Sequence, residues 1–270
     1  MTVDTWLTDA AEYLAGHDVP SARLDAVVLL EDMLKQDRAY ILAHPELTIA
    51  KAQHAQLQKQ LERRARHEPL GYIRGRSEFY GRDFFVNNTV LEPRPESETI
   101  IDVLKRLPKM TRIADIGTGS GALAITAKLE LPECEVAAVD IDPACLHVAE
   151  QNANKHGAKL PLFTGDLLEP FMQESADFAP DVLLCNLPYV PDDLPINQAA
   201  THEPSLALFG GPDGLDLFRR LFKQIDQLST RPVVIAESLP SQHAALSLVA
   251  QDHGYQQQAE DGFIQLFSLA

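Results

Sequence analysis

The sequence has few of the features that metal centres, disulfide frameworks and membrane spans require. Its three cysteines, Cys134, Cys145 and Cys185, form no CxxC pair, so we expect neither a disulfide framework nor a zinc site. The nine histidines contain no HExxH pair, and no metal site is predicted. No apolar run approaches the roughly 18 residues of a membrane span, and the first residues lack the pattern of a secretory signal. We therefore expect a cytoplasmic protein without a membrane partner.

Positive charge is also scarce. The chain has 23 Lys and Arg residues against 39 Asp and Glu residues, and almost all of the net charge of −16 falls after residue 75. An acidic surface repels phosphate backbones, which disfavours a nucleic-acid substrate and favours a protein or a small molecule. One basic band, with cations from Lys59 to Arg76, is either a solvated helix face or a docking surface for an acidic partner.

Apolar residues are plentiful and divide the chain into three parts. They make up 45% of the 270 residues, which is enough for a catalytic domain and a smaller one. In residues 1–73 they recur at helical spacing and predict a small helical bundle. Aromatic and β-branched residues around Gly81, followed by the Pro93-Arg94-Pro95 segment, predict a β-hairpin and linker over residues 74–95. Residues 96–270 form the predicted catalytic domain.

Short apolar runs alternate with helical patterns from residue 112 onward. This alternation predicts an α/β fold with a doubly wound, mostly parallel, Rossmann-like sheet and helices on both faces. In such a sheet the ligand lies beyond the carboxyl ends of the strands. The runs expected to be strands are RIADIG, EVAAVD, LPLFTGD, DVLLCNLPYV, PVVIAES and FIQLFSL.

A glycine-rich segment follows the first of these strands. Gly117, Thr118, Gly119, Ser120 and Gly121 lead directly into a predicted helix. Because the glycines lack side chains and a helix N-terminus offers free N–H groups, a nucleotide-like cofactor is expected to contact this backbone. The spacing alone does not separate NAD from S-adenosyl-L-methionine.

Carboxylates end the next two strands. Asp140 closes EVAAVD and is placed to accept hydrogen bonds from both ribose hydroxyls of an adenosine, while Asp142 is the expected N-cap of the following helix. Asp166 closes LPLFTGD, where it can accept from the adenine amino group, and Leu167 can cover the adenine ring. Together with the glycine segment, these residues predict a cofactor that contains adenosine.

The fourth strand ends in an amide, an aliphatic residue, a proline and a tyrosine. The Asn186 side-chain oxygen and the Leu187 carbonyl can each accept one N–H of a planar NH₂ group, and Asn186 is expected to touch the cofactor as well. Holding both hydrogens orients a poorly nucleophilic amide nitrogen and stabilises the positive charge that develops on it during attack. Pro188 stiffens the turn, and Tyr189 offers a face for the planar group.

The glycine segment and the Asn-Leu-Pro-Tyr segment together resemble the class I S-adenosylmethionine methyltransferases that modify amide or exocyclic amino nitrogens. Longer stretches, such as EPLGYIRGRSEFYGRDFFV and THEPSLALFGGPDGLDLFRRL, resemble the HemK-like N5-glutamine methyltransferases of peptide chain release factors. The usual motif in these proteins is Asn-Pro-Pro-Tyr, so this chain departs from it at Leu187. It also lacks an expected basic residue and valine in its last strand.

This resemblance implies a fold, a cofactor and a partner. The fold would be the seven-stranded class I methyltransferase sheet, and the cofactor S-adenosyl-L-methionine. The substrate would be the glutamine of a Gly-Gly-Gln loop on a release factor, which residues 1–73 help to dock. Gly117 to Gly121 and Asp140 would bind the cofactor, Asn186 to Tyr189 would hold the glutamine, and Arg94 and Glu203 would shape the pocket.

Three other interpretations stay open. An adenine-N6 methyltransferase of DNA or RNA could use the same loop on a flipped base, although the acidic charge argues against direct nucleic-acid binding. A non-catalytic homologue could bind release factor without methylating it, and an NAD dehydrogenase is the more distant option. Methyl transfer by a monomer is the interpretation we prefer.

Overall fold

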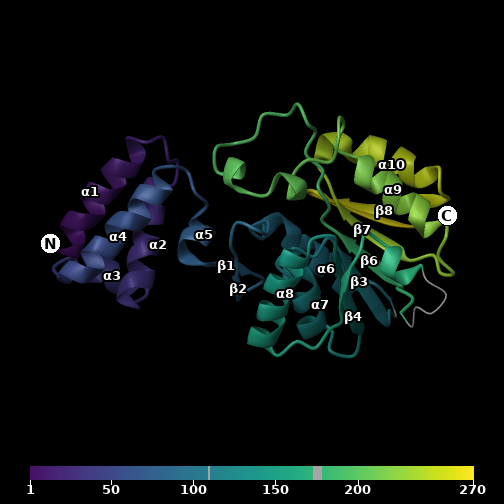
Figure 1. Cartoon of the computed structure of the whole chain (residues 1–270), viewed down its shortest axis with the longest axis horizontal. Coiled ribbons are helices and arrows are strands. Elements are labelled where there is room, and N and C mark those ends of the chain that lie inside the picture. Colours follow the sequence, from purple (N-terminus) through teal and green to yellow (C-terminus); the bar gives the residue numbers. More distant parts are fainter. Residues whose placement is uncertain (109, 173–177) are drawn as a thin grey trace. The chain divides into compact units, whose positions relative to one another are not determined.

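The computed structural model describes residues 1–108, 110–172 and 178–270. The chain forms two compact units. One contains residues 1–76 and 197–202, and the other contains residues 77–196 and 203–270. Figure 1 labels most of their helices and strands.

The first unit is built from helices. Trp6, Leu14, Leu30 and Leu57 are among its buried residues and form one hydrophobic core. The apolar spacing of the sequence predicts this helical character, because the same side chains recur once per turn on the inner face of each helix. The helices are α1 (Val3–Ala15), α2 (Ala22–Leu34), α3 (Arg38–Ala43), α4 (Lys51–Arg64) and α5 (Leu70–Arg74). Residues 197–202, which belong to the same unit, contain the 3₁₀ turn η3 (Ala200–His202).

Internal ion pairs occupy most of the basic band. Arg64 is 9% exposed and donates to the buried Asp25 at 2.7 Å, and Arg74 donates to Asp32 at 2.6 Å. Arg76 also pairs with Asp32, and Arg63 pairs with Glu68. The pairing explains most of these cations as structural groups of the first unit, and it leaves the exposed Lys59 and Arg66 as the outward charges of the band.

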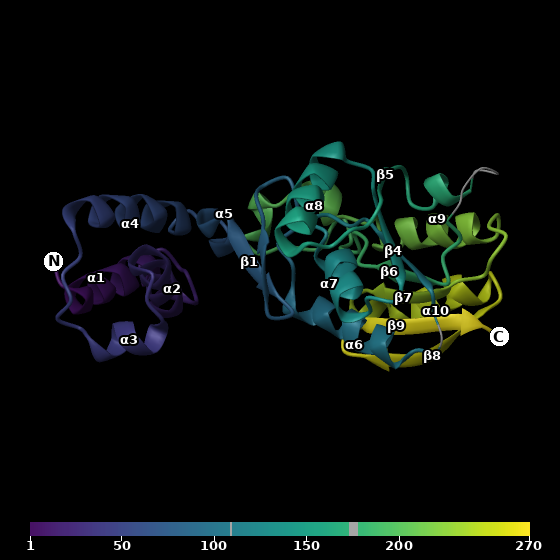
Figure 2. The same ribbon diagram turned by 90° about the horizontal axis from the view of Figure 1, so that it is seen from below.

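The second unit contains the seven-stranded sheet. Its order is β5-β4-β3-β6-β7-β9-β8, with parallel pairing from β5 to β7 and antiparallel pairing of β9 with both β7 and β8. Figure 2 shows β5 at one edge and β8 at the other. This confirms the predicted doubly wound, mostly parallel fold. The strands are β3 (Arg112–Ile116), β4 (Glu135–Asp140), β5 (Leu162–Thr164), β6 (Val182–Cys185), β7 (Val233–Glu237), β8 (Tyr255–Asp261) and β9 (Ile264–Leu269).

Helices cover both faces of this sheet (Figure 1). Side chains of α6, α7 and α8 share one core with Ile113 and Leu184, whereas those of α9 and α10 share the other with Ala114 and Leu183. Successive residues of the central strands thus alternate between two cores, which explains why these strands are mostly apolar. The helices are α6 (Glu98–Arg106), α7 (Ala122–Glu130), α8 (Pro143–His156), α9 (Asp216–Ile225) and α10 (His243–Gln251).

A small β-sheet and four 3₁₀ turns complete the described elements of this part. Strands β1 (Arg76–Phe79) and β2 (Arg82–Phe85) pair with each other, and Phe79 and Phe84 join the core of α6 and α7. The turns are η1 (Pro95–Ser97), η2 (Glu169–Phe171), η4 (Ser205–Ala207) and η5 (Pro240–Gln242). The sequence pattern predicts six of the seven strands of the large sheet and misses β8, whose polar YQQQAED segment is mostly exposed at the sheet edge.

Candidate active site

The carboxyl ends of β3, β4 and β6 meet beside one pocket. The strand order changes direction at β3, with β4 on one side and β6 on the other, and such a switch point opens a crevice. The pocket has a volume of about 220 Å³. Ten of the predicted site residues line it: Gly117, Thr118, Gly119, Ser120, Asp140, Asp166, Leu167, Asn186, Leu187 and Pro188. Gly121 and Tyr189 are not among the lining residues.

The glycine segment has a backbone that only glycine adopts readily. Gly117, Gly119 and Gly121 have φ angles of +74°, +53° and +80°. A Cβ at Gly121 would lie 2.9 Å from Ile125 and 3.1 Å from Ala149, so this glycine lets α7 and α8 pack closely. A Cβ at Gly119 would meet no atom within 4 Å, which leaves its pocket side open to a ligand.

Asp140 is fixed beneath this segment. Its Oδ2 accepts from the Gly119 N–H at 2.8 Å, and its Oδ1 accepts from the Asp142 N–H at 3.0 Å. The side chain is nearly buried, and burial raises the pKa of Asp140. The Cys145 thiol also lies beside this carboxyl. Because a carboxylate has about four acceptor positions, it keeps acceptor capacity for a ligand. Asp142 itself accepts from the Ala144 N–H at 2.8 Å, which confirms it as the N-cap of α8.

Asp115 is a second buried carboxylate in the same corner, and it is not among the site residues predicted from the sequence. Its Oδ2 accepts from the Thr118 hydroxyl at 2.6 Å and from the Ala124 N–H at 3.1 Å. Its Oδ1 is buried without a hydrogen bond from any described residue. Burial raises the pKa of Asp115 to about 7. An acidic residue inside the strand that precedes a glycine segment is the signal that could have identified it.

Asp166 has a protein partner that the sequence did not reveal. Its carboxylate pairs with Arg220 of α9, and Arg220 also lines the pocket. The adjacent Leu167 is buried, has a φ of +57° and lines the pocket. The predicted adenine contacts of Asp166 and Leu167 stay predictions, and Arg220 becomes a further candidate at this end of the pocket.

Asn186 and Leu187 present two free acceptors at the end of β6. The Asn186 Nδ2 donates to the Ser97 hydroxyl oxygen at 2.8 Å, while its Oδ1 accepts no hydrogen bond within the described part of the chain. The Leu187 carbonyl likewise accepts none from the residues described. The Leu187 side chain is buried, and its Cδ2 lies 3.2 Å from the position of a Cβ on Gly117. The glycine segment and residues 186–190, which we call the acceptor loop, therefore pack against each other.

Tyr189 is held from both ends. Its hydroxyl donates to Glu237 Oε1 at 3.0 Å, and its carbonyl accepts from Gln242 Nε2 at 2.8 Å. Its ring packs on the core formed with α9 and α10, and burial raises the pKa of its hydroxyl. The structure therefore gives Tyr189 two anchoring contacts, and its expected contact with a planar substrate group stays a prediction.

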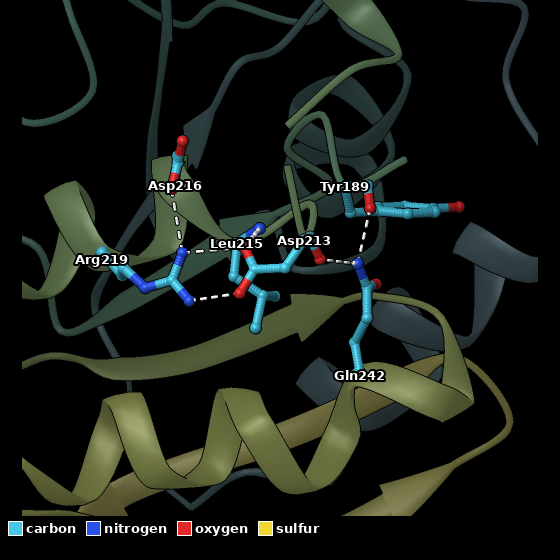
Figure 3. A network of polar contacts seen from close by, with 6 residues as sticks. All are labelled: Tyr189, Asp213, Leu215, Asp216, Arg219 and Gln242. Atoms are coloured by element: carbon cyan, nitrogen blue, oxygen red, sulfur yellow. Dashed lines mark hydrogen bonds and ion pairs between the residues drawn. The ribbon is translucent and has the colours of Figure 1, made fainter. Parts of the chain in front are cut away.

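Residues 210–214, which we call the buttress loop, support the acceptor loop from behind. The Gly210 N–H donates to Val190 O at 2.9 Å. Gln242 Nε2 donates to the Asp213 carbonyl at 2.8 Å as well as to Tyr189, and so joins the two loops (Figure 3). Arg219 pairs with the Asp213 side chain and lowers the pKa of that carboxyl to about 2.

Arg94 and Glu203 form an ion pair next to the pocket wall. Glu203 is 7% exposed, and its Oε1 also accepts from the Glu92 N–H at 3.2 Å. The neighbouring residues Pro93 and Pro204 line the pocket. The pair thus joins the two segments that form this wall, which is consistent with the pocket-shaping role that the resemblance implies.

Residues 1–108, 110–172 and 178–270 contain no group of three or more His, Cys, Asp or Glu side chains that could hold a metal ion. None of the helices in these ranges is long and apolar enough to cross a membrane.

Solved structures share the fold of this chain. A methyltransferase from Pyrococcus furiosus matches with a TM-score of 0.50 and 17% identity, covering 81% of this chain and 96% of that one. The catalytic domain of hMettl16, in complex with the MAT2A 3′UTR hairpin 1, matches with a TM-score of 0.55 and 14% identity, covering 83% and 82%. At these identities the matches support the fold alone.

Sequence comparisons are more specific. Residues 5–75 match the PrmC N-terminal domain, and residues 95–203 match the methyltransferase small domain. A release factor glutamine methyltransferase of Koribacter versatilis is 39% identical over 231 residues, which cover 83% of this chain and 81% of that protein. One of Moorella thermoacetica is 40% identical over 230 residues, covering 82% and 79%. The chain is therefore an enzyme that belongs to the family of release factor glutamine methyltransferases.

Proposed function

We propose that this enzyme transfers the methyl group of S-adenosyl-L-methionine to the side-chain nitrogen, N5, of the glutamine in the Gly-Gly-Gln motif of a peptide chain release factor. The observation that carries the proposal is a pair of acceptors, Asn186 Oδ1 and Leu187 O, which accept no hydrogen bond from the described residues and belong to residues that line one pocket with the glycine segment. A primary carboxamide has two N–H donors in one plane, and two adjacent acceptors match it. The names of the relatives support the same substrate.

The pocket residues fit the cofactor. Gly119 leaves open space along the backbone, and Asp140 keeps acceptor positions beside it. In this proposal Gly117 to Gly121 hold the methionine part, Asp140 holds the ribose hydroxyls, and Asp166 and Leu167 border the adenine. When bound, S-adenosylmethionine supplies an electrophilic methyl group on a positively charged sulfur.

The chain's own residues then act by position. Asn186 and Leu187 orient the glutamine nitrogen and stabilise the positive charge that develops on it. Both acceptors lie on a loop that Ser97, Glu237 and Gln242 fix in place, so little reorganisation is needed. After transfer the surplus proton leaves to water. The helical part, residues 1–73 as predicted from the sequence, docks the release factor in this proposal, and the enzyme acts as a cytoplasmic monomer.

Asp140→Asn tests the cofactor assignment. The substitution keeps the size of the side chain but replaces one acceptor oxygen with a donor and removes the charge. A hydrogen bond to a charged group contributes about 1.5 to 3 kcal/mol, so the Kd for S-adenosylhomocysteine should rise roughly 10- to 150-fold. Isothermal titration calorimetry measures this change. An unchanged Kd would remove Asp140 from the cofactor site.

Mass spectrometry tests the methyl acceptor. Purified release factor, incubated with the enzyme and S-adenosylmethionine, should gain one methyl group on the glutamine of its Gly-Gly-Gln motif. A parallel reaction with isotope-labelled cofactor, DNA and RNA should leave the nucleic acids unlabelled. Label on nucleic acid alone would favour the adenine-methylating alternative, and binding of release factor without label would favour a non-catalytic homologue.

A further inference from the structure

Glu237 is a buried carboxylate behind the acceptor loop. The proposed function assigns it no contact with the cofactor or the substrate. It ends β7, next to β6, and is 1% exposed. Its Oε1 accepts from the Tyr189 hydroxyl at 3.0 Å. Its Oε2 is buried and has no hydrogen bond from any residue that the structure describes. Burial raises the pKa of Glu237, and the Ser97 and Tyr189 hydroxyls beside it oppose that shift.

Ser97 has a buried hydroxyl group whose hydrogen needs an acceptor. It is 2% exposed, and its Oγ accepts from Asn186 Nδ2 at 2.8 Å. The hydroxyl hydrogen must then point elsewhere, because a buried donor without an acceptor is destabilising. Ser97 lies beside Glu237, whose Oε2 accepts no hydrogen bond from any described residue, the Ser97 hydroxyl included. A small movement that brings the Ser97 hydroxyl into hydrogen-bond geometry with Glu237 would satisfy both groups.

We propose that Glu237 is a positioning residue that sets the direction of the hydrogen bonds from itself through Ser97 to Asn186, and so keeps the Asn186 oxygen facing the substrate. An ionised carboxylate only accepts hydrogen bonds, so Ser97 must donate to it. Ser97 can then accept from Asn186 only through the Asn186 NH₂ group. This orientation leaves Oδ1 as the group that meets the substrate nitrogen. The inference rests on the proposed function of Asn186 as an acceptor.

Glu237→Gln reverses this order with almost no change of shape. The new carboxamide oxygen can still accept from Tyr189, while its NH₂ donates to Ser97. Ser97 then donates to the Asn186 oxygen, and the Asn186 carboxamide turns its own NH₂ toward the pocket. The NH₂ group of Asn186 would then face the NH₂ group of the substrate glutamine, and the acceptor that the substrate needs would be missing. We expect kcat/KM for release factor to fall about 10- to 100-fold.

A double-mutant cycle separates this effect from a general structural one. Ser97→Ala removes the hydroxyl that links Glu237 to Asn186. Adding Glu237→Gln to the Ser97→Ala variant should therefore change kcat/KM by less than about twofold. In all three variants the Kd for S-adenosylhomocysteine should stay within about threefold of the wild-type value. Glu150→Gln, at an exposed position of α8, removes one charge as a matched control. If the double variant loses kcat/KM by the product of the two single losses, the inference is overturned.

A readout without substrate makes the inference independent of the proposed reaction. The side-chain ¹⁵N–¹H signals of Asn186 are identified by their loss in Asn186→Ala. They should move in Glu237→Gln and stay in place in Glu150→Gln. If the wild-type enzyme methylates release factor and Glu237→Gln matches it, this inference fails and the proposed function stands. If the wild-type enzyme does not methylate release factor, the proposed function fails, and unmoved Asn186 signals in Glu237→Gln would overturn the inference as well.

Discussion

Asn186→Ala should lower kcat/KM for release factor on the order of 100- to 1000-fold and remove the methyl mass shift under ordinary assay conditions. Loss of one preorganised group that stabilises developing charge has an effect of about this size in other active sites. The substitution also leaves the Ser97 hydroxyl without its donor. The glycine segment and Asp140 keep their own hydrogen bonds, so the Kd for S-adenosylhomocysteine should change by less than tenfold, or about 1.4 kcal/mol.

The control for this experiment is another Asn→Ala substitution in the same unit. Asn154 lies exposed on α8, and Asn154→Ala should retain the wild-type rate. Mass spectrometry of release factor gives the product, and calorimetry gives the cofactor affinity. Full methylation by Asn186→Ala would show that the side-chain oxygen does not hold the substrate. A joint loss of activity and of cofactor binding would indicate a collapsed pocket instead.

The sheet and its ligand edge could be predicted from the sequence because local patterns determine them. Runs such as RIADIG and EVAAVD are mostly apolar, as expected of strands covered on both faces, and each ends in a glycine or a carboxylate. Parallel strands bring such ends to the same edge. The structure therefore places Gly119, Asp140 and Asn186 around one pocket, although they are far apart in the chain.

The supporting contacts could not be predicted in this way. Ser97 and Asn186 are 89 positions apart, and Tyr189 is 48 positions from Glu237 and 53 from Gln242. Such pairs have no periodicity and depend on how β6 and β7 align. Asp166 shows the same limit, because the sequence gives no sign of its ion pair with Arg220.

The buttress loop gives the second large prediction. Gly214 has a φ of +77°, and a Cβ there would lie 2.0 Å from the Tyr189 carbonyl oxygen and 2.3 Å from Gln242 Nε2. A Cβ does not approach backbone this closely, so Gly214→Ala must push the buttress loop and the acceptor loop apart. Displacing positioned groups by about 1 Å costs on the order of 100-fold in rate. We expect that loss in kcat/KM, with a smaller change in cofactor affinity.

Gly254→Ala is a matched control because it separates backbone strain from collision. Gly254 has a φ of +81°, almost the same as Gly214, but a Cβ there would meet no atom within 4 Å. In both variants the alanine must adopt a left-handed backbone conformation, which costs about 1 to 2 kcal/mol. Thermal unfolding should therefore show a similar contribution of this strain to the loss of stability in each variant. Only Gly214→Ala moves the Tyr189 carbonyl. Equal kcat/KM values in the two variants would show that the acceptor loop keeps its geometry without the buttress, whereas a selective loss in Gly214→Ala would show that residues 210–214 hold the substrate acceptors in place.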